Sequence, residues 1–251
     1  MGEPVFLVAG ASSGMGRETA RRLGAGGRGG HVVLAARSAG PLEEAAEAIR
    51  AAGGSASAVA FDGTDAASCA ELIERIERDH GRLDGAFNNL GDTLGDGPLH
   101  EIPRERWEKT LGVNLFAPFH LMRAQIPLML RQGGGGRIVN NASTGGLRGT
   151  KGMADYSAAK WGLIGLTKSA ALDYAGAGLI INVIAPGIIA TEKFRQFEQR
   201  MPDIFEGLRT ATPAQRFGEM SEIAGLVHFL LRDAPAYLNG AVIPIDGART
   251  A

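Results

Sequence analysis

Short apolar runs alternate with stretches of helical periodicity along almost the whole chain. In the longer stretches apolar residues recur every three or four positions, whereas the short runs are almost continuously apolar. Near-continuous apolar strands between helices are typical of a parallel sheet covered on both faces. We therefore predict an α/β fold in a single domain, residues 1–251, with a doubly wound, mostly parallel seven-stranded sheet and helices on both faces. The expected strands are 5–9, 31–36, 56–61, 83–88, 136–141, 179–184 and 241–245.

Two glycine-rich stretches interrupt this alternation, at 23–31 and 131–137. Each precedes a predicted strand rather than a helix. Because no helix N-terminus follows to hold an anion, we interpret both as helix-to-strand connections and not as phosphate-binding loops.

Composition and charge narrow the class of protein. The 251 residues are 45% hydrophobic, enough for a large core, and the net charge of −1 gives no electrostatic footprint for nucleic acid. No apolar run reaches the length of a membrane span, and the first residues, MGEPVFLV, lack the layout of a signal peptide. Cys69 is the single cysteine and cannot form an internal disulfide. We expect a cytoplasmic protein without nucleic-acid, membrane or metal partners.

The first predicted strand leads into a glycine-rich turn and then into an amphipathic stretch that begins near Met15. Glycines at such a turn allow backbone angles that a side chain forbids, and the helix N-terminus offers unpaired N–H groups and a positive dipole to a pyrophosphate. Two serines add hydroxyl donors. The sequence therefore predicts a dinucleotide phosphate site in a Rossmann fold. Its expected residues are Gly10, Ser12, Ser13, Gly14, Met15 and Gly16.

A tyrosine and a lysine lie one helical turn apart in the segment YSAAKWGLIGLTKSAAL. Lys160 follows Tyr156 by four residues, which places both side chains on one face of a helix, and Ser143 precedes the tyrosine by thirteen. A free tyrosine has a pKa of about 10, and a cation at ~4 Å in an effective dielectric of ~20 supplies roughly 4 kcal/mol, enough to bring that pKa near ~7. The spacing suits proton transfer, and an exposed helix pair without function has the same spacing.

Together with further motifs, these residues resemble the classical short-chain dehydrogenase/reductase family over nearly the whole chain. The matching motifs are the loop from Gly10 to Gly16, Asp62 after the third strand, Asn88-Asn89-Leu90-Gly91 after the fourth, Asn114, Ser143, Tyr156 with Lys160, and Pro186-Gly187 followed by Thr191. The resemblance implies an NAD(P)-dependent oxidoreductase that interconverts a ketone and a secondary alcohol by hydride transfer.

The resemblance also implies a role for each catalytic residue. Tyr156 is the acid when a ketone is reduced and the base when an alcohol is oxidised. Lys160 lowers the pKa of the tyrosine and holds the nicotinamide ribose, and Ser143 orients the substrate oxygen. Asn114 positions a water that links Lys160 to solvent; the alternative for an asparagine within a helix is a bond to its own backbone.

Further cofactor contacts follow from the same resemblance. Asp62 accepts from the adenine amino group, although an Asp followed by Gly also fits a simple turn. Thr191 and the Ile189 backbone hold the nicotinamide carboxamide. The remaining expected cofactor residues are Gly63, Asn89 and Gly91, together with Pro186 and Gly187, which set the turn before the carboxamide contacts.

The end of the second predicted strand bears on the choice between NAD and NADP. Enzymes that prefer NAD usually place Asp or Glu there to accept from the ribose hydroxyls. Ala36 and Arg37 occupy these positions. Because no carboxylate repels a 2′-phosphate and a guanidinium is available to grip it, we expect NADP(H) to be favoured over NAD(H). The alternative is an arginine that merely begins the next loop in solvent.

Three residues depart from the family pattern. Ala9 stands where the family has a threonine whose hydroxyl ties the glycine loop to a second loop, and Leu90 stands where the family has alanine. We expect apolar packing to replace that polar tie. Ala248 replaces the second glycine of an Asp-Gly-Gly motif that the family uses for subunit contacts.

Two further expectations concern larger segments. Residues 191–216, which are rich in charged and aromatic side chains, resemble the mobile substrate lid of the family; the alternative is an ordinary surface helix pair.

The helical stretches 104–131 and 154–175 resemble those that pair between subunits in the family. We expect a homotetramer, with a dimer as the next choice.

The sequence leaves the substrate open. The leading interpretation is an NADP-dependent oxidoreductase acting on a small ketone or alcohol. An alternative within the family is a 3-oxoacyl-thioester (acyl-carrier-protein) reductase, whose anionic carrier would meet basic residues at Arg148, Lys151, Lys193 and Arg195. An alternative of another class is a catalytically silent dinucleotide-binding sensor or scaffold, against which the intact catalytic motif argues.

Overall fold

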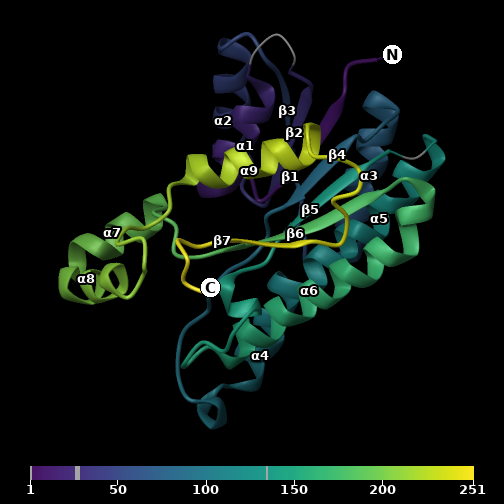
Figure 1. The fold of residues 1–251 in the computed structure, drawn as a ribbon. Helices are drawn as coiled ribbons and strands as arrows, with labels where there is room; N and C mark the ends of the chain where they lie inside the picture. The colour runs from purple at the N-terminus through teal and green to yellow at the C-terminus, as the bar shows by residue number, and fades with distance from the viewer. Residues whose placement is uncertain (1, 26–28, 134) are drawn as a thin grey trace.

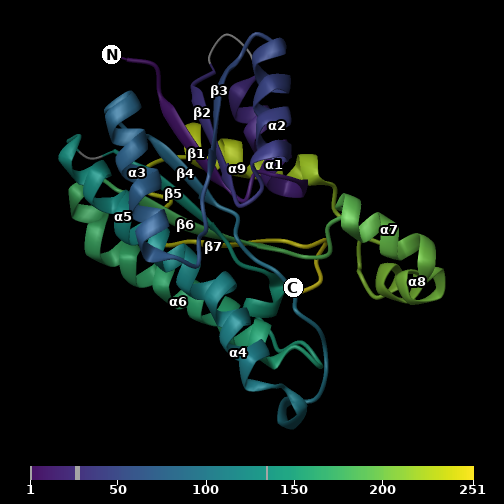
Figure 2. The same ribbon diagram turned by 180° about the vertical axis from the view of Figure 1, so that it is seen from behind.

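The protein is built around one parallel sheet of seven strands in the order β3-β2-β1-β4-β5-β6-β7 (Figures 1 and 2). The computed structural model describes residues 2–25, 29–133 and 135–251. The strands are β1 (Val5–Ala9), β2 (His31–Ala36), β3 (Ser55–Ala60), β4 (Gly85–Asn88), β5 (Arg137–Asn141), β6 (Ile180–Pro186) and β7 (Val242–Ile245). The predicted doubly wound sheet is confirmed, and every described pairing in it is parallel.

Helices cover both faces of the sheet. On one face lie α1 (Gly14–Gly24), α2 (Ala39–Ala51) and α9 (Met220–Arg232), and on the other lie α3 (Ala66–His80), α5 (Ala117–Arg131) and α6 (Ala154–Tyr174). The remaining helices are α4 (Arg104–Leu111), α7 (Glu192–Arg200) and α8 (Pro202–Thr210), with single turns η1 (Leu99–Glu101), η2 (Gly112–Phe116), η3 (Thr144–Gly146) and η4 (Ala175–Ala177). None of the described helices is both long and apolar enough to cross a bilayer.

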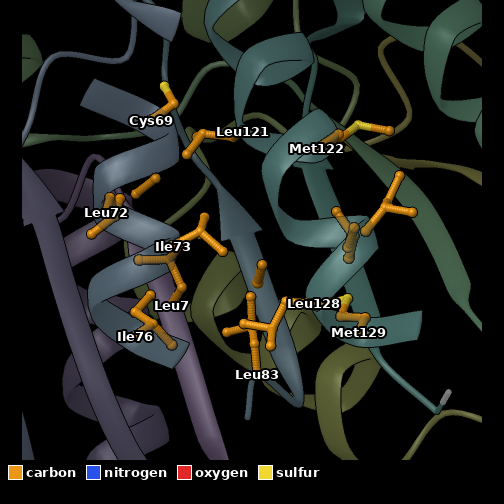
Figure 3. Packing of buried hydrophobic residues seen from close by; sticks show 14 of the residues in the cluster. Leu7, Cys69, Leu72, Ile73, Ile76, Leu83, Leu121, Met122, Leu128 and Met129 are labelled. Carbon is orange, nitrogen blue, oxygen red and sulfur yellow. The ribbon is translucent and has the colours of Figure 1, made fainter. Parts of the chain in front are cut away.

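Alternation along the strands divides the core into two layers. In β1, Leu7 belongs to the layer under α3 and α5, whereas Phe6 and Val8 belong to the layer under α1, α2 and α9. Figure 3 shows part of the first layer, in which apolar side chains of α3 and of α5 lie on two sides with Leu7 and Leu83 among them. A fully buried Leu side chain contributes roughly 1.5–3 kcal/mol. The central strands are therefore held from both sides, which fixes their carboxyl ends.

The two glycine-rich stretches connect α1 to β2 and α5 to β5. Residues 26–28 of the first stretch and residue 134 of the second lie outside the described part of the chain, so only the ends of these connections are seen.

One expected helix is interrupted. The stretch 104–131 was predicted as a single helix, but it comprises α4, one π-helical turn at η2, and α5. The Asn114 side chain explains the break, because its Nδ2 donates to the Thr110 carbonyl at 3.0 Å, the group that the Asn114 backbone N–H would use in a regular helix. Such π-turns are frequent at functional sites.

Ala248 is one of two described non-glycine residues with a left-handed backbone, at φ 67°. An L-residue in this region costs roughly 1–2 kcal/mol. The alanine that replaces the family glycine therefore stores strain at the turn after β7.

Candidate active site

Two cavities meet at the carboxyl ends of the strands. Their volumes are about 650 Å³ and 330 Å³, and Ser13, Asn89 and Gly91 line both of them, so they form one continuous groove. Ligands of open α/β sheets bind at this edge, and pockets of some 300–1,000 Å³ hold small molecules and cofactors. The groove is the candidate site.

The glycine loop opens this groove at the start of α1. Gly10 and Gly14 have φ values of +81° and +56°, which a side chain would strain. Ser13 is the N-cap of α1 but its side chain makes no capping hydrogen bond, and the first turn of the helix contains no acidic residue. The N-terminal amides of α1 and its positive dipole therefore suit a pyrophosphate.

A polar tie holds the glycine loop to the loop after β4. Asn89 donates from Nδ2 to the Gly10 carbonyl at 3.2 Å and from its backbone N–H to the Ala9 carbonyl at 3.0 Å, and its own Oδ1 accepts from Asn141 at 2.7 Å. The expectation that apolar packing replaces the tie is therefore wrong in part. Leu90 does pack against the apolar core, but Asn89 supplies the polar link that the family threonine would make.

Gly16 does not line the groove and instead lets the loop close on itself. A Cβ at Gly16 would lie 2.1 Å from the Gly10 carbonyl oxygen and 2.8 Å from Asn89 Nδ2. Gly16→Ala should therefore push the loop apart and weaken NADPH binding by about tenfold or more, the equivalent of one lost hydrogen bond to a charged phosphate. Titration of NADPH fluorescence measures this loss.

Gly40→Ala is the matched control for this prediction. Gly40 lies in the first turn of α2, and a Cβ there meets nothing within 4 Å. The control should bind NADPH like the wild type and unfold at an equal or higher temperature, because alanine favours a helix. Equal affinities of all three proteins would contradict the packing role of Gly16.

The smaller cavity is lined at one end by Arg37, Asp62 and Gly63. Arg37 directly follows the last residue of β2 and is exposed at the rim. Asp62 Oδ1 accepts from the Thr64 backbone and hydroxyl at 2.9 and 2.8 Å, and these bonds hold the pKa of Asp62 below its usual value. The turn expected as the alternative for Asp62 is thus present, and the carboxylate lines the cavity as well.

Ser143, Tyr156 and Lys160 converge on the larger cavity. Ser143 follows β5 and accepts from the Gly145 N–H at 3.1 Å, and its hydroxyl acts to lower the pKa of the Tyr156 phenol. Tyr156 lies in the first turn of α6, one turn before Lys160. The predicted helix carries both residues, and the exposed-pair alternative fails because Lys160 is only 2% exposed.

Two backbone carbonyls, at the end of β5 and just after β4, hold the Lys160 ammonium. Its Nζ donates to the Asn141 carbonyl at 2.8 Å and to the Leu90 carbonyl at 3.5 Å, and it lies 5.7 Å from the centre of the Tyr156 ring. Burial lowers the pKa of the Lys160 ammonium to about 7. At neutral pH the lysine can therefore both give and accept a proton.

The protein groups alone do not lower the pKa of Tyr156, contrary to the prediction. Burial raises the pKa of Tyr156, against the opposing effect of the Ser143 hydrogen bond, and the negative charge of Asp92 raises it further. Desolvation of the phenolate is the largest of these effects and outweighs that of Ser143. The phenol is consequently protonated at neutral pH.

Asn114 lies behind Gly91 rather than in the groove. Its Nδ2 donates to the carbonyls of Asp92 and Thr110 at 2.8 and 3.0 Å, so the bonding to its own helix that was the alternative is present. Its buried Oδ1 has no hydrogen-bond partner among the described residues. A Cβ on Gly91 would lie 2.9 Å from this oxygen and 3.1 Å from Lys160 Nζ, which places both atoms beside the same glycine.

The chain after β6 closes the far end of the larger cavity. Pro186, Gly187, Ile189 and Thr191, all expected to bind the cofactor, line this cavity. A Cβ on Gly187 would lie 2.8 Å from the backbone of Asp246, so only glycine fits this turn. The Thr191 hydroxyl accepts from the Phe194 N–H at 3.2 Å and caps α7, and its proton remains available to a ligand.

Sequence reasoning missed several residues that line the groove. The loop after β4 contributes lining residues from Asp92 to Leu94, and α4 and η2 contribute Lys109 and Val113. Asn141 directly precedes Ala142-Ser143. Its backbone carbonyl accepts from Lys160 Nζ, and its side-chain amide donates to Asn89 Oδ1. The run Asn140-Asn141 at the end of an apolar strand was a usable signal for Asn141, whereas nothing local marks Lys109 or Val113.

Comparisons with known proteins place the chain in a family. A family model described as enoyl-(acyl carrier protein) reductase matches residues 10–249. The chain is 35% identical to levodione reductase of Leifsonia aquatica (98% of this chain, 94% of the relative) and 36% identical to the 3-oxoacyl-(acyl-carrier-protein) reductase of Escherichia coli K12 (97% and 96%). It superimposes on a crystal structure of a variant of actinorhodin polyketide ketoreductase with NADPH with a TM-score of 0.91, at 31% identity (98% and 97%). The chain therefore belongs to the short-chain dehydrogenase/reductase family of oxidoreductases.

Proposed function

We propose that this protein reduces a ketone to a secondary alcohol with NADPH and catalyses the reverse reaction with NADP⁺. The observation that carries the proposal is the convergence of Ser143, Tyr156 and Lys160 on the groove that the glycine loop opens. NADPH, when bound, supplies the hydride, and the protein supplies position and a proton.

The proton passes from the Tyr156 hydroxyl to the carbonyl oxygen as that oxygen gains charge. The raised pKa of Tyr156 keeps the phenol in the donor form, and Ser143 offers a second hydroxyl to hold the carbonyl oxygen. Lys160, with a pKa of about 7, then supplies a proton to restore the Tyr156 hydroxyl. The unpaired Oδ1 of Asn114 is suited to hold a water on the way from Lys160 to solvent.

The groove fits NADP(H) along its length. The α1 N-terminus would hold the pyrophosphate, Lys160 would hold the nicotinamide ribose, and Ile189 with Thr191 would hold the carboxamide. At the other end, Ala36 and Arg37 line the smaller cavity without a carboxylate at the strand end. A guanidinium there favours the additional 2′-phosphate of NADP(H) over NAD(H).

The substrate side of the groove favours an uncharged ketone. Glu192 brings a carboxylate to the larger cavity, and the rings of Phe194 and Phe197 give it apolar surface. Among the lining side chains that the structure describes, Lys160 is the only cation, and its ammonium is bonded to backbone carbonyls. The Glu192 carboxylate would therefore repel an anionic substrate.

A second candidate is a 3-oxoacyl-thioester reductase. Arg148 and Lys151 are exposed in the loop after Ser143, where they are accessible to an acidic carrier protein. Arg195, by contrast, pairs with Glu219 at 3.0 Å. The side chain of Lys193 lies outside the described part of the structure.

One set of substrates separates these candidates. NADPH oxidation is measured with a neutral ketone, a keto acid of the same size, a 3-oxoacyl thioester of N-acetylcysteamine, and the same acyl group on a carrier protein. We expect kcat/KM for the neutral ketone to exceed that for the keto acid by about tenfold, the effect of one repulsive contact, and the carrier to bring no gain. A large gain from the carrier would favour the second candidate, and NADPH binding without oxidation in any assay would favour a silent sensor.

We propose that α7 and α8 act as a lid over the substrate. The pair projects from the body of the protein in Figures 1 and 2. Phe194 packs against Phe205 and Phe217, with ring centres 4.6 and 4.8 Å apart, so the pair is itself a packed unit. Phe194 and Phe197 also line the larger cavity, which makes this unit one wall of the substrate site.

We propose a homotetramer as the assembled form. Phe116, Phe119, Trp161 and Leu172 are exposed on η2, α5 and α6, the segments expected to pair between subunits. Apolar side chains gathered on one pair of helices indicate a protein interface. Light scattering at micromolar concentration should give four times the mass of the chain, and a monomer would contradict the proposal.

The single cysteine, which is buried and forms no disulfide, is consistent with a cytoplasmic location. Cys69 is buried, and burial raises the pKa of its thiol to about 12. A thiol of this kind is inert and needs no oxidising compartment. We therefore propose the cytoplasm as the place of action.

A further inference from the structure

A buried ion pair joins α4 to the first turn of α6, immediately before Tyr156. Arg106 Nε lies 2.9 Å from Asp155 Oδ2, and Arg106 Nη2 lies 3.0 Å from Asp155 Oδ1, so the contact is bidentate. The two side chains are 14% and 2% exposed, which makes this the most buried ion pair among the described residues. Such a fork fixes direction as well as distance.

The same guanidinium holds two loops beside the substrate side of the groove. Arg106 Nη1 donates to the Asp96 carbonyl at 3.0 Å and Nη2 to the Gly152 carbonyl at 3.4 Å. The Gly97 N–H also donates to Gly152, at 3.0 Å, so the loops are bonded to each other. The first of these loops carries Thr93, which lines the larger cavity.

The carboxylate of Asp155 extends the connection to the reacting groups. Asp155 directly precedes Tyr156 in the first turn of α6, and its carboxylate accepts from the Thr110 hydroxyl at 2.9 Å. The Thr110 carbonyl in turn accepts from Asn114 Nδ2. The ion pair is therefore connected to the proton donor on one side and to the π-turn behind Lys160 on the other.

Fold stability alone does not account for this arrangement. Taking two charges out of water is costly, and a well-packed apolar pair is often as stable as a buried ion pair. What the charged pair adds is a fixed geometry for three groups, the carbonyls of Asp96 and Gly152 in two loops and the hydroxyl of Thr110 on α4. These elements surround the point where a ketone must meet Tyr156.

We propose that Arg106 and Asp155 are positioning residues that hold Tyr156 and the substrate-side loops in the geometry for proton and hydride transfer. The inference rests on the proposed function. Neither side chain lines the groove, so both act through the groups they hold.

Arg106→Lys tests the proposal, with Arg104→Lys as the matched control. The lysine keeps the charge but cannot span both carboxylate oxygens and two carbonyls. We expect the single-turnover rate of NADPH oxidation, counted per bound NADPH, to fall about tenfold or more, since small displacements of reacting groups have effects of this size. The KM for the ketone should rise while NADPH affinity stays unchanged. Arg104, on the same helix, pairs with Glu108 at the surface, and its variant should behave like the wild type.

Thr110→Val keeps the ion pair and removes only the hydrogen bond from the Thr110 hydroxyl to Asp155. It therefore tests the same proposal if Arg106→Lys does not fold. It should also lower the single-turnover rate, by less than Arg106→Lys. A merely structural pair would reduce the number of NADPH-binding sites and leave the rate per site unchanged, and that outcome would overturn the proposal.

Hydrogen exchange separates this inference from the proposed function. Arg106→Lys should speed amide exchange in residues 92–98 and 148–153 and leave β1 unaffected, whether or not a ketone substrate is known. An inactive wild type would refute the proposed function alone. Unchanged exchange in both loops, or an unchanged single-turnover rate in an active enzyme, would refute the positioning role alone.

Discussion

Tyr156→Phe should lower turnover roughly 100-fold or more, the usual contribution of a positioned general acid. The change removes the phenolic oxygen and leaves a ring of the same shape in the first turn of α6. Because the glycine loop, Arg37 and Thr191 line the groove and are proposed to contact the cofactor, NADPH binding should persist. Lys160→Met should damage both properties, since Nζ reaches the Asn141 carbonyl at the base of the groove.

Tyr174→Phe is the control for this experiment. Tyr174 ends the same helix and packs against the core, away from the groove. Turnover is measured on a ketone for which a kinetic isotope effect shows that chemistry limits the rate, and binding is measured by NADPH fluorescence. If Tyr156→Phe kept the turnover of the wild type under these conditions, the proton donor would be another group.

Arg37→Ala should weaken NADPH binding by about 1.5–3 kcal/mol, the range for a hydrogen bond to a charged group, and leave NADH binding nearly unchanged. Arg37 is exposed at the rim of the smaller cavity, where it forms no part of the core. Ala36→Asp should act further, because a carboxylate at the end of β2 repels the 2′-phosphate and accepts from the ribose hydroxyls. The double variant should therefore prefer NADH, through repulsion as well as attraction.

Titration of both dinucleotides against the wild type and each variant measures the preference. Arg75→Ala, which removes a partly exposed arginine from α3, controls for the loss of a positive charge at a distance. Equal losses of NADH and NADPH affinity in Arg37→Ala would mean that Arg37 serves its loop and not the phosphate.

The sheet could be predicted from the sequence because its strands are short apolar runs bounded by polar loops. All seven were expected, and the observed ends differ by at most two residues, as for β4 and β6. The interruption of the stretch 104–131 could not be predicted in this way. Apolar periodicity runs through it, and the π-turn depends on a single side-chain bond from Asn114 to Thr110.

The candidate site was predicted to the extent that its residues occur in local motifs. The glycine loop, Ser143, Tyr156 and Lys160 lie where their motifs indicate. The Asn89 tie, the Arg106–Asp155 pair and the lining residues on α4 join segments that are far apart in the chain, so spacing does not reveal them. The direction of the Tyr156 pKa shift could not be predicted from the sequence, because its largest cause is burial, which depends on the whole fold.

Transfer of a deuterium label tests the central claim most directly. NADPH that carries deuterium at the transferred position of the nicotinamide is incubated with the enzyme and a neutral ketone, and the product is analysed by mass spectrometry and NMR. We predict one deuterium on the carbinol carbon of the alcohol for each NADPH consumed. An alcohol without the label, or NADPH consumed without any alcohol, would contradict direct hydride transfer to a ketone in this site.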